Sequence, residues 1–87
     1  MKVVVMPIEV VTWHDREGIA TPVRFRVTTK DDKEQVVKIL RIVSRDMERL
    51  AGNTMHIYNC LSEINGVERE LQIKYEVDTC KWMLFKI

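Results

Sequence analysis

Four side chains of this chain could ligate a metal ion: His14, His56, Cys60 and Cys80. Structural zinc sites take their ligands in close pairs such as Cys-x2-Cys, because one tight turn then presents two ligands to a tetrahedral ion. Here the only near pair is His56 and Cys60, and in a strand these two residues would lie roughly 13 Å apart, at about 3.3 Å per residue. We therefore expect no metal site.

The same residues could supply a nucleophile and a base. A Cys/His pair also needs a third group that orients the imidazole and donors that stabilise an oxyanion. Cys60 or Cys80 with His56 supplies only the thiol and the imidazole. The three glycines, Gly18, Gly52 and Gly66, stand in no phosphate-binding pattern. We expect no enzyme activity and no cofactor, and we expect both cysteines to be free structural thiols, each a small and partly buried hydrophobe, in the reducing cytoplasm.

Basic side chains form a candidate binding face. If the strand at residues 22–28 pairs with the segment that follows it, one face would gather the basic side chains. These basic residues are Arg24, Arg26, Lys38 and Arg41. The candidate aromatic contacts are Trp13, Tyr58, Tyr75 and Trp82. Small β-barrels bind single-stranded nucleic acids by stacking bases on aromatic side chains in a basic groove. The net charge is only +1, however, and acids stand beside nearly every base, which weakens attraction to phosphates. Single-stranded nucleic acid is therefore the alternative partner.

A surplus of apolar residues favours protein interaction. Val3, Val5 and Val11 lie on the strand face opposite Met6, Ile8 and Val10, and the segment 81–87 is apolar on both faces. Either a closed barrel buries these side chains or they mark an interface. We therefore predict a protein-interaction or assembly module that binds another protein or a second copy and no membrane. Its sensitive apolar edge should consist of Trp82, Leu84 and Phe85.

Size and composition predict one ordinary globular domain over residues 1–87. The chain has 87 residues, 46% of them hydrophobic and 31% charged, which is enough for one small core. The apolar stretch 1–11 is interrupted by Lys2, Pro7 and Glu9, so we expect neither a signal peptide nor a membrane span.

Alternating apolar residues and turn signals predict several strands. Residues 3–12 are dense in β-branched residues, and Pro7 predicts that this strand lies at a sheet edge. In the strand at 22–28, the residues Val23, Phe25 and Val27 should face the core. Further strands are predicted at 54–61 and 67–77, around a type I′ turn at Asn65-Gly66, and at 80–87.

The segment 34–50 permits two interpretations. Its apolar residues form a stripe with helical spacing, which Gly52 would cap. These residues are Val36, Ile39, Leu40, Val43, Met47 and Leu50. Five β-branched residues and the short turn at 30–33 favour a strand instead, with a bulge near Leu40-Arg41 that resets the alternation.

The carboxy-terminal residues Lys74-Tyr-Glu, followed by Thr79-Cys-Lys-Trp82, resemble a family of small uncharacterised bacterial proteins, mostly clostridial. Pro22-Val-Arg-Phe-Arg26 resembles the second strand of the same family. In that family the position of Leu40 is often polar, which implies a strand rather than a helix at 34–50. The resemblance implies no activity or cofactor. We predict an all-β fold, a small antiparallel barrel or roll of five or six strands, with an α+β fold carrying a central helix at 34–50 as the alternative.

Overall fold

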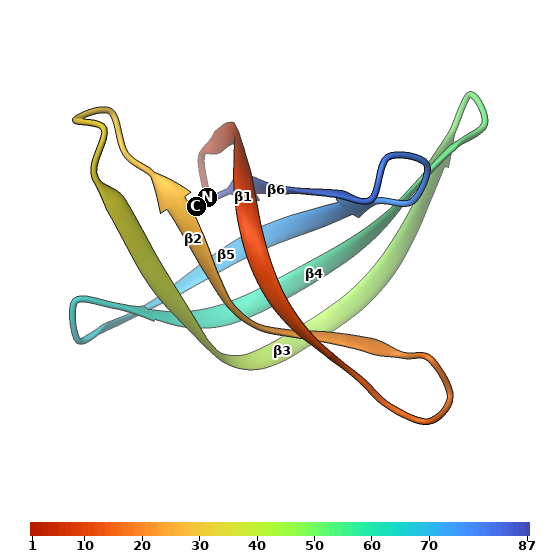
Figure 1. Ribbon diagram of the computed structural model, residues 1–87, viewed down its shortest axis with the longest axis horizontal. Coiled ribbons are helices and arrows are strands. Elements are labelled where there is room, and N and C mark those ends of the chain that lie inside the picture. The colour runs from red at the N-terminus through yellow and green to blue at the C-terminus, as the bar shows by residue number, and fades with distance from the viewer.

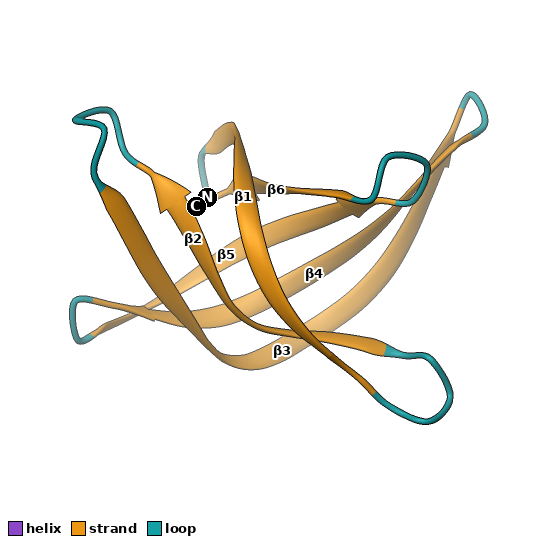
Figure 2. Ribbon diagram, viewed as in Figure 1, coloured by secondary structure: helices purple, strands orange, loops and turns teal.

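The computed structural model describes residues 1–87 and contains six strands and no helix (Figures 1 and 2). The strands are β1 (Val3–His14), β2 (Ala20–Thr28), β3 (Glu34–Leu50), β4 (Asn53–Ile64), β5 (Val67–Glu76) and β6 (Lys81–Lys86). Each strand pairs antiparallel with its neighbours in the order β1-β2-β3-β4-β5-β6, and β6 returns to β1. The predicted small antiparallel barrel is thus confirmed, and no apolar helix of membrane-spanning length is present.

The two chain ends lie together where β1 meets β6 (Figure 1). The Lys2 amide donates to the Ile87 carbonyl at 2.7 Å, and the Ile87 amide donates to the Lys2 carbonyl at 2.9 Å. The prediction that Pro7 marks an edge strand is wrong, because β1 pairs on both sides. Pro7 stands opposite Met83 of β6, and the register with β2 begins only at Ile8.

The segment 34–50 is one strand, so the helix alternative is wrong. The register between β3 and β4 shifts twice, and each shift leaves one extra residue on β3, at Leu40 and at Val43. These two bulges change the spacing of the inward residues, which are Val37, Ile39 and Ile42. Of the six apolar residues with helical spacing, only Ile39 is buried, and the other five are exposed. The stripe therefore does not mark the face of β3 that packs on the core.

Two hairpin turns use residues with positive φ. Asn65 (51°) and Gly66 (79°) join β4 to β5, which confirms the predicted turn position. Ala51 (49°) and Gly52 (82°) join β3 to β4 in the same way. Two central residues with positive φ are the pattern of a type I′ turn, so Gly52 closes a hairpin and does not cap a helix.

A further bulge in β2 corrects one predicted core position. Val11 of β1 pairs with Arg24, and the next residue, Thr12, pairs with Pro22. Val23 is the extra residue of this bulge and is 39% exposed, whereas Phe25 and Val27 are buried. Alternation predicted Val23 in the core because a bulge leaves no signal in the apolar pattern.

The core fills the middle of the barrel. It consists of Ile8, Phe25, Val27, Val37, Ile39, Tyr58, Cys60, Leu71, Ile73 and Leu84. Of the two outcomes open for the apolar residues at the carboxy terminus, the structure shows burial by barrel closure: Leu84 is buried, and Trp82 and Phe85 are half-buried. Barrel closure explains this, since β6 packs between β5 and β1.

Candidate functional site

The predicted basic residues lie on the outer face of β2 and β3, where acidic residues stand among them. Arg24 stands opposite Lys38 in the register, and Lys38 stands opposite Glu63 on its other side. Arg41 follows the Leu40 bulge and is exposed. The structure therefore brings Arg24 and Lys38 together next to an acid.

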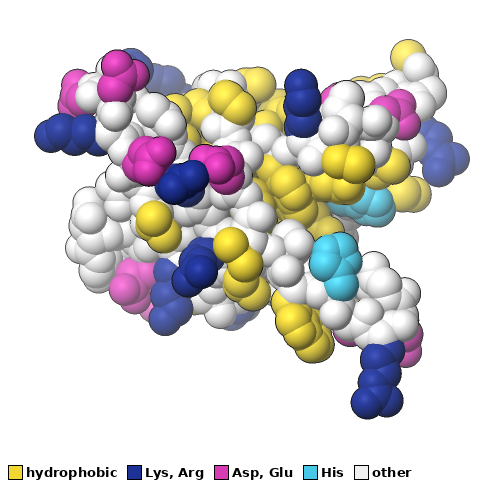
Figure 3. Space-filling view, viewed as in Figure 1, with side chains coloured by type: hydrophobic (Ala, Val, Ile, Leu, Met, Phe, Trp, Pro, Cys, Tyr) yellow, Lys and Arg dark blue, Asp and Glu magenta, His cyan; other side chains and the backbone are white.

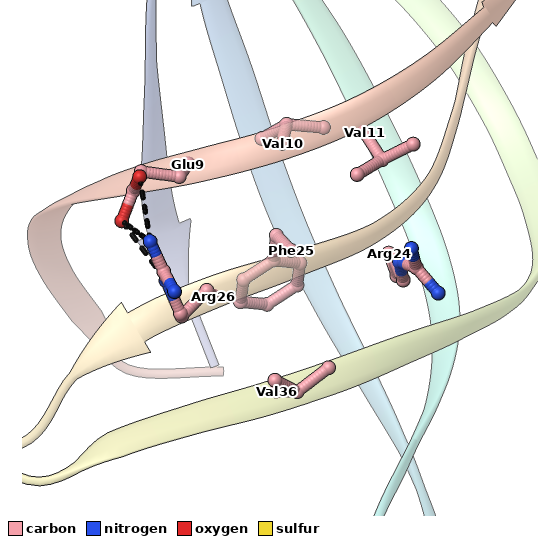
Figure 4. Close-up of a pocket in the computed structure, with 7 residues that line it drawn as sticks. All are labelled: Glu9, Val10, Val11, Arg24, Phe25, Arg26 and Val36. Carbon is pink, nitrogen blue, oxygen red and sulfur yellow. Dashed lines mark hydrogen bonds and ion pairs between the residues drawn. The ribbon is translucent and has the colours of Figure 1, made fainter.

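Arg26 is held by two carboxylates. Its guanidinium donates to both carboxylate oxygens of Glu9 at 2.9 Å, and it lies 3.3 Å from a carboxylate oxygen of Glu34. The hydrogen bond to Glu9 and the charge of Glu34 raise the pKa of Arg26. Figure 4 shows Arg26 turned toward Glu9 and Arg24 pointing away from this pair. The charge of Arg26 is thus already compensated.

Trp82 lies apart from these residues, within an aromatic cluster on the inner face of the barrel. Its ring centroid is 4.8 Å from that of Tyr75 and 5.5 Å from that of Tyr58. His56 extends the row, 6.3 Å from Tyr75. The register explains the row, because His56, Tyr75 and Trp82 are cross-strand partners on β4, β5 and β6.

The barrel is open beside this cluster, because strand pairing is incomplete at one end. β2 pairs with β3 only as far as Arg24 and Lys38, so the last twelve residues of β3, from Ile39 to Leu50, pair with β4 alone. Likewise, β1 pairs with β6 only as far as Ile8. The β1–β2 turn and the β3–β4 turn therefore diverge, as the lower right and upper right of Figure 1 show.

A cleft of about 330 Å³ lies between the two hairpins. Its walls include Ile19, Ala20, Arg45, His56, Tyr58 and Tyr75. In Figure 3 the surface is deeply notched on this side, with apolar side chains in the notch and a histidine on each flank. The cleft therefore offers aromatic surface next to a few polar groups, a composition typical of binding sites.

Arg45 connects the two walls of the cleft. Its guanidinium donates to the Ala20 carbonyl at 2.6 Å and to Thr21 Oγ1 at 2.8 Å, and it lies 5.4 Å from the centre of the Tyr58 ring. The Tyr58 hydroxyl also donates to the Ala20 carbonyl, at 3.4 Å. Burial raises the pKa of Tyr58. These contacts join β2 to β3 where their backbones no longer pair.

The cysteines and histidines lie in different parts of the molecule. Cys60 is buried in the core, and burial raises the pKa of its thiol to about 12. Cys80 is exposed in the β5–β6 turn, so the expectation of a partly buried thiol is wrong there. His14 lies at the end of β1, with its Nε2 3.2 Å from Thr12 Oγ1. No three His, Cys, Asp or Glu side chains form a group that could hold a metal ion.

Sequence reasoning missed the cleft and the role of Arg45. A usable signal was strand length: residues 34–50 make a strand of 17 residues, whereas its predecessor β2 has only 9. A strand that long must extend beyond its partner and leave part of one edge unpaired.

Comparisons of the chain with protein-family models, curated proteins and solved structures find no match.

Proposed function

We propose that this protein is a cytoplasmic protein-interaction module that binds another polypeptide at the open end of the barrel. The observation that supports the proposal is the unpaired part of β3, which runs beside the aromatic cleft. Large apolar side chains near this end are exposed to solvent: Trp13 is 63% exposed, Met47 54% and Leu50 64%. Exposed apolar and aromatic side chains of this kind are typical of protein interfaces.

The charges favour a protein partner over a nucleic acid. Arg26 is paired with Glu9 and Glu34, and the buried Lys74 lies 3.4 Å from a carboxylate oxygen of Glu48. Arg45 is bound to the β2 backbone. Binding to phosphates releases counterions only where cations are free to neutralise them. Of the four predicted basic residues only Arg26 is neutralised in this way, and the net charge of +1 weakens the attraction of the other three to phosphates.

A photo-cross-linking amino acid tests where the partner binds. Placed at Leu50 in living cells, it should give a discrete protein adduct. Val67, which is 65% exposed in the β4–β5 hairpin, is a matched control for Leu50. Adducts at Leu50 and none at Val67 would support the proposal, whereas no protein adduct at Leu50, or equal adducts at both positions, would contradict it.

Oligonucleotide binding tests the alternative function. A single-stranded oligonucleotide should bind negligibly at physiological salt, as measured by fluorescence anisotropy. Tight binding that weakens steeply with salt, and that is lost when Arg24 and Arg26 are both replaced by Ala, would instead favour a nucleic-acid function.

A further inference from the structure

The edge of β3 has backbone groups available for another strand. The two-residue turn at Ala51-Gly52 makes Leu50 and Asn53 a hydrogen-bonded pair. In an antiparallel ladder such pairs alternate, so Glu48, Asp46 and Ser44 also bond to β4. Arg45, Met47 and Arg49 therefore direct their backbone groups to the opposite side of β3, where no strand pairs with them.

This edge is regular. The two bulges of β3, at Leu40 and Val43, precede it, and residues 44–50 pair with β4 without a register shift and contain no proline. The amide of Met47 donates to the carboxylate of Asp46 at 2.8 Å, a local bond that an incoming carbonyl could replace. Proteins usually block such edges with bulges, prolines or covering segments. Residues 44–50 contain no bulge or proline, and the β1–β2 hairpin is bonded to this stretch through the Arg45 side chain.

A second copy of the chain does not fit this edge. In an antiparallel pair, residues directly opposite one another have their side chains on the same face of the sheet. When two copies of β3 are related by a twofold axis, the axis must therefore pass beside a residue and not between two residues. Centred on Met47, the pairing places Arg45 opposite Arg49 and Asp46 opposite Glu48. Centred on Arg45, Asp46 or Glu48, it places that residue opposite its own copy. Like charges directly opposite one another are destabilising in each register.

The side chains along the edge indicate what would fit. Arg45, Met47 and Arg49 share the inner face with Tyr58 and His56, their partners in the register. Asp46 and Glu48 lie on the outer face. A complementary strand carries acids opposite the two arginines, an apolar residue opposite Met47, and bases opposite the two acids. Arg45 keeps donors for such an acid, because its two bonds to β2 use two of five N–H groups.

We propose that an extended segment of a different protein adds as an antiparallel strand to the β3 edge from Arg45 to Arg49, and that its sequence alternates acid, base, apolar residue, base and acid. Backbone bonds to Arg45, Met47 and Arg49 supply affinity, and the alternating charges supply selectivity, as in other cases of strand addition. This inference rests on the proposed interaction function and names the form and chemistry of the partner.

A synthetic peptide tests the pattern directly. The probe is the blocked nonapeptide Ser-Thr-Glu-Lys-Val-Lys-Glu-Thr-Ser with a fluorescent label, and the control exchanges its Lys and Glu residues. The probe should bind saturably, and the control at least tenfold more weakly. Equal binding of the two peptides, or no binding of the probe, would overturn the proposal. If the probe fails while Leu50 still gives protein adducts, strand addition is wrong and the interaction function stands.

Replacing Met47 tests the backbone contacts. Met47→Pro removes the edge N–H without removing a bond to β4, and Met47→Val is the matched control that keeps the N–H. The proline variant should bind the probe at least tenfold more weakly, and the valine variant within about twofold of the original protein. Equal binding by the two variants would overturn the proposal.

Arg49→Glu serves if the proline variant does not fold, and it also tests the direction of the added strand. In the antiparallel arrangement, Arg49 faces the first Glu of the probe. Arg49→Glu should weaken probe binding, and a peptide with Lys in place of that first Glu should restore it. Restoration only by Lys in place of the second Glu would overturn the antiparallel register.

The oligomeric state is the remaining test. Analytical ultracentrifugation should give the 10.3 kDa mass of a single chain. A dimer that the probe peptide dissociates would show that a second copy occupies the edge, and this result would overturn the proposal.

Discussion

At the scale of single residues, Cys60 is a titratable group within the core. Burial raises the pKa of its thiol to about 12, whereas the pKa of a cysteine thiol in an unfolded chain is about 8.5. Between these two values the folded chain keeps this proton and the unfolded chain loses it. The free energy of unfolding therefore falls as pH rises through this range, by up to about 1.4 kcal/mol per pH unit.

Unfolding by urea between pH 7.5 and pH 10.5 measures this effect. Cys60→Ala removes the thiol and should be less stable at pH 7.5, but its stability should fall less steeply as pH rises. The buried Tyr58 titrates in both proteins, so the difference in slope reports the loss of the Cys60 thiol together with the effect of its charge on Tyr58. Parallel pH profiles for the two proteins would contradict the burial of this thiol.

Arg45 acts at the same scale by connecting two hairpins. Arg45→Met keeps the apolar stem over Tyr58 but removes the bonds to Ala20 and Thr21. The β1–β2 hairpin should then open more often, because each such bond contributes about 1 kcal/mol. Trypsin should cleave after Arg16 severalfold faster than in the unaltered protein. Arg49→Met is the control, and equal acceleration by both substitutions would show that the Arg45 bonds do not hold the hairpin.

At the scale of elements, the β2 bulge determines which valines enter the core. Val27→Asp places a carboxylate in the core and should prevent stable folding, because an unpaired buried charge is very costly. Val23→Asp should change the free energy of unfolding by no more than about 0.5 kcal/mol, as is usual for exposed positions. Thermal unfolding of the two variants measures the contrast. Comparable losses of stability would mean that Val23 faces inward and that the bulge is absent.

Strand positions and turns could be predicted from local sequence to a large extent. Asn65-Gly66 and the alternation of Leu71, Ile73 and Tyr75 are local signals, and both correspond to the structure. Segment 34–50 permits two interpretations because exposed apolar residues such as Val36, Val43 and Met47 have helical spacing, and because the bulges at Leu40 and Val43 interrupt the strand alternation. Bulges depend on the register with β4, and register is a long-range property that a single strand does not reveal.

At the scale of the whole molecule, barrel closure and the open end have the same origin. Strands of unequal length surround one core, so β6 and β1 close the barrel at the chain ends while β3 extends beyond β2 (Figure 2). The cleft joins Ala20 to Arg45 and Tyr58, which are distant in sequence. Charge and aromatic content could therefore indicate candidate binding residues one by one. They could not show which residues share a face: the predicted binding face combines Arg24 and Trp82, which lie on different faces of the barrel.

Amide hydrogen exchange, followed by NMR on the free chain and then with the probe peptide, tests the free β3 edge most directly. In the free chain the amides of Asp46 and Glu48, which bond to β4, should exchange slowly, and those of Arg45 and Arg49 should exchange rapidly. The peptide should slow exchange at Arg45 and Arg49 and leave Asp46 and Glu48 unchanged. Uniform protection of residues 45–49 in the free chain, or no added protection with the peptide, would contradict a free edge that binds a strand.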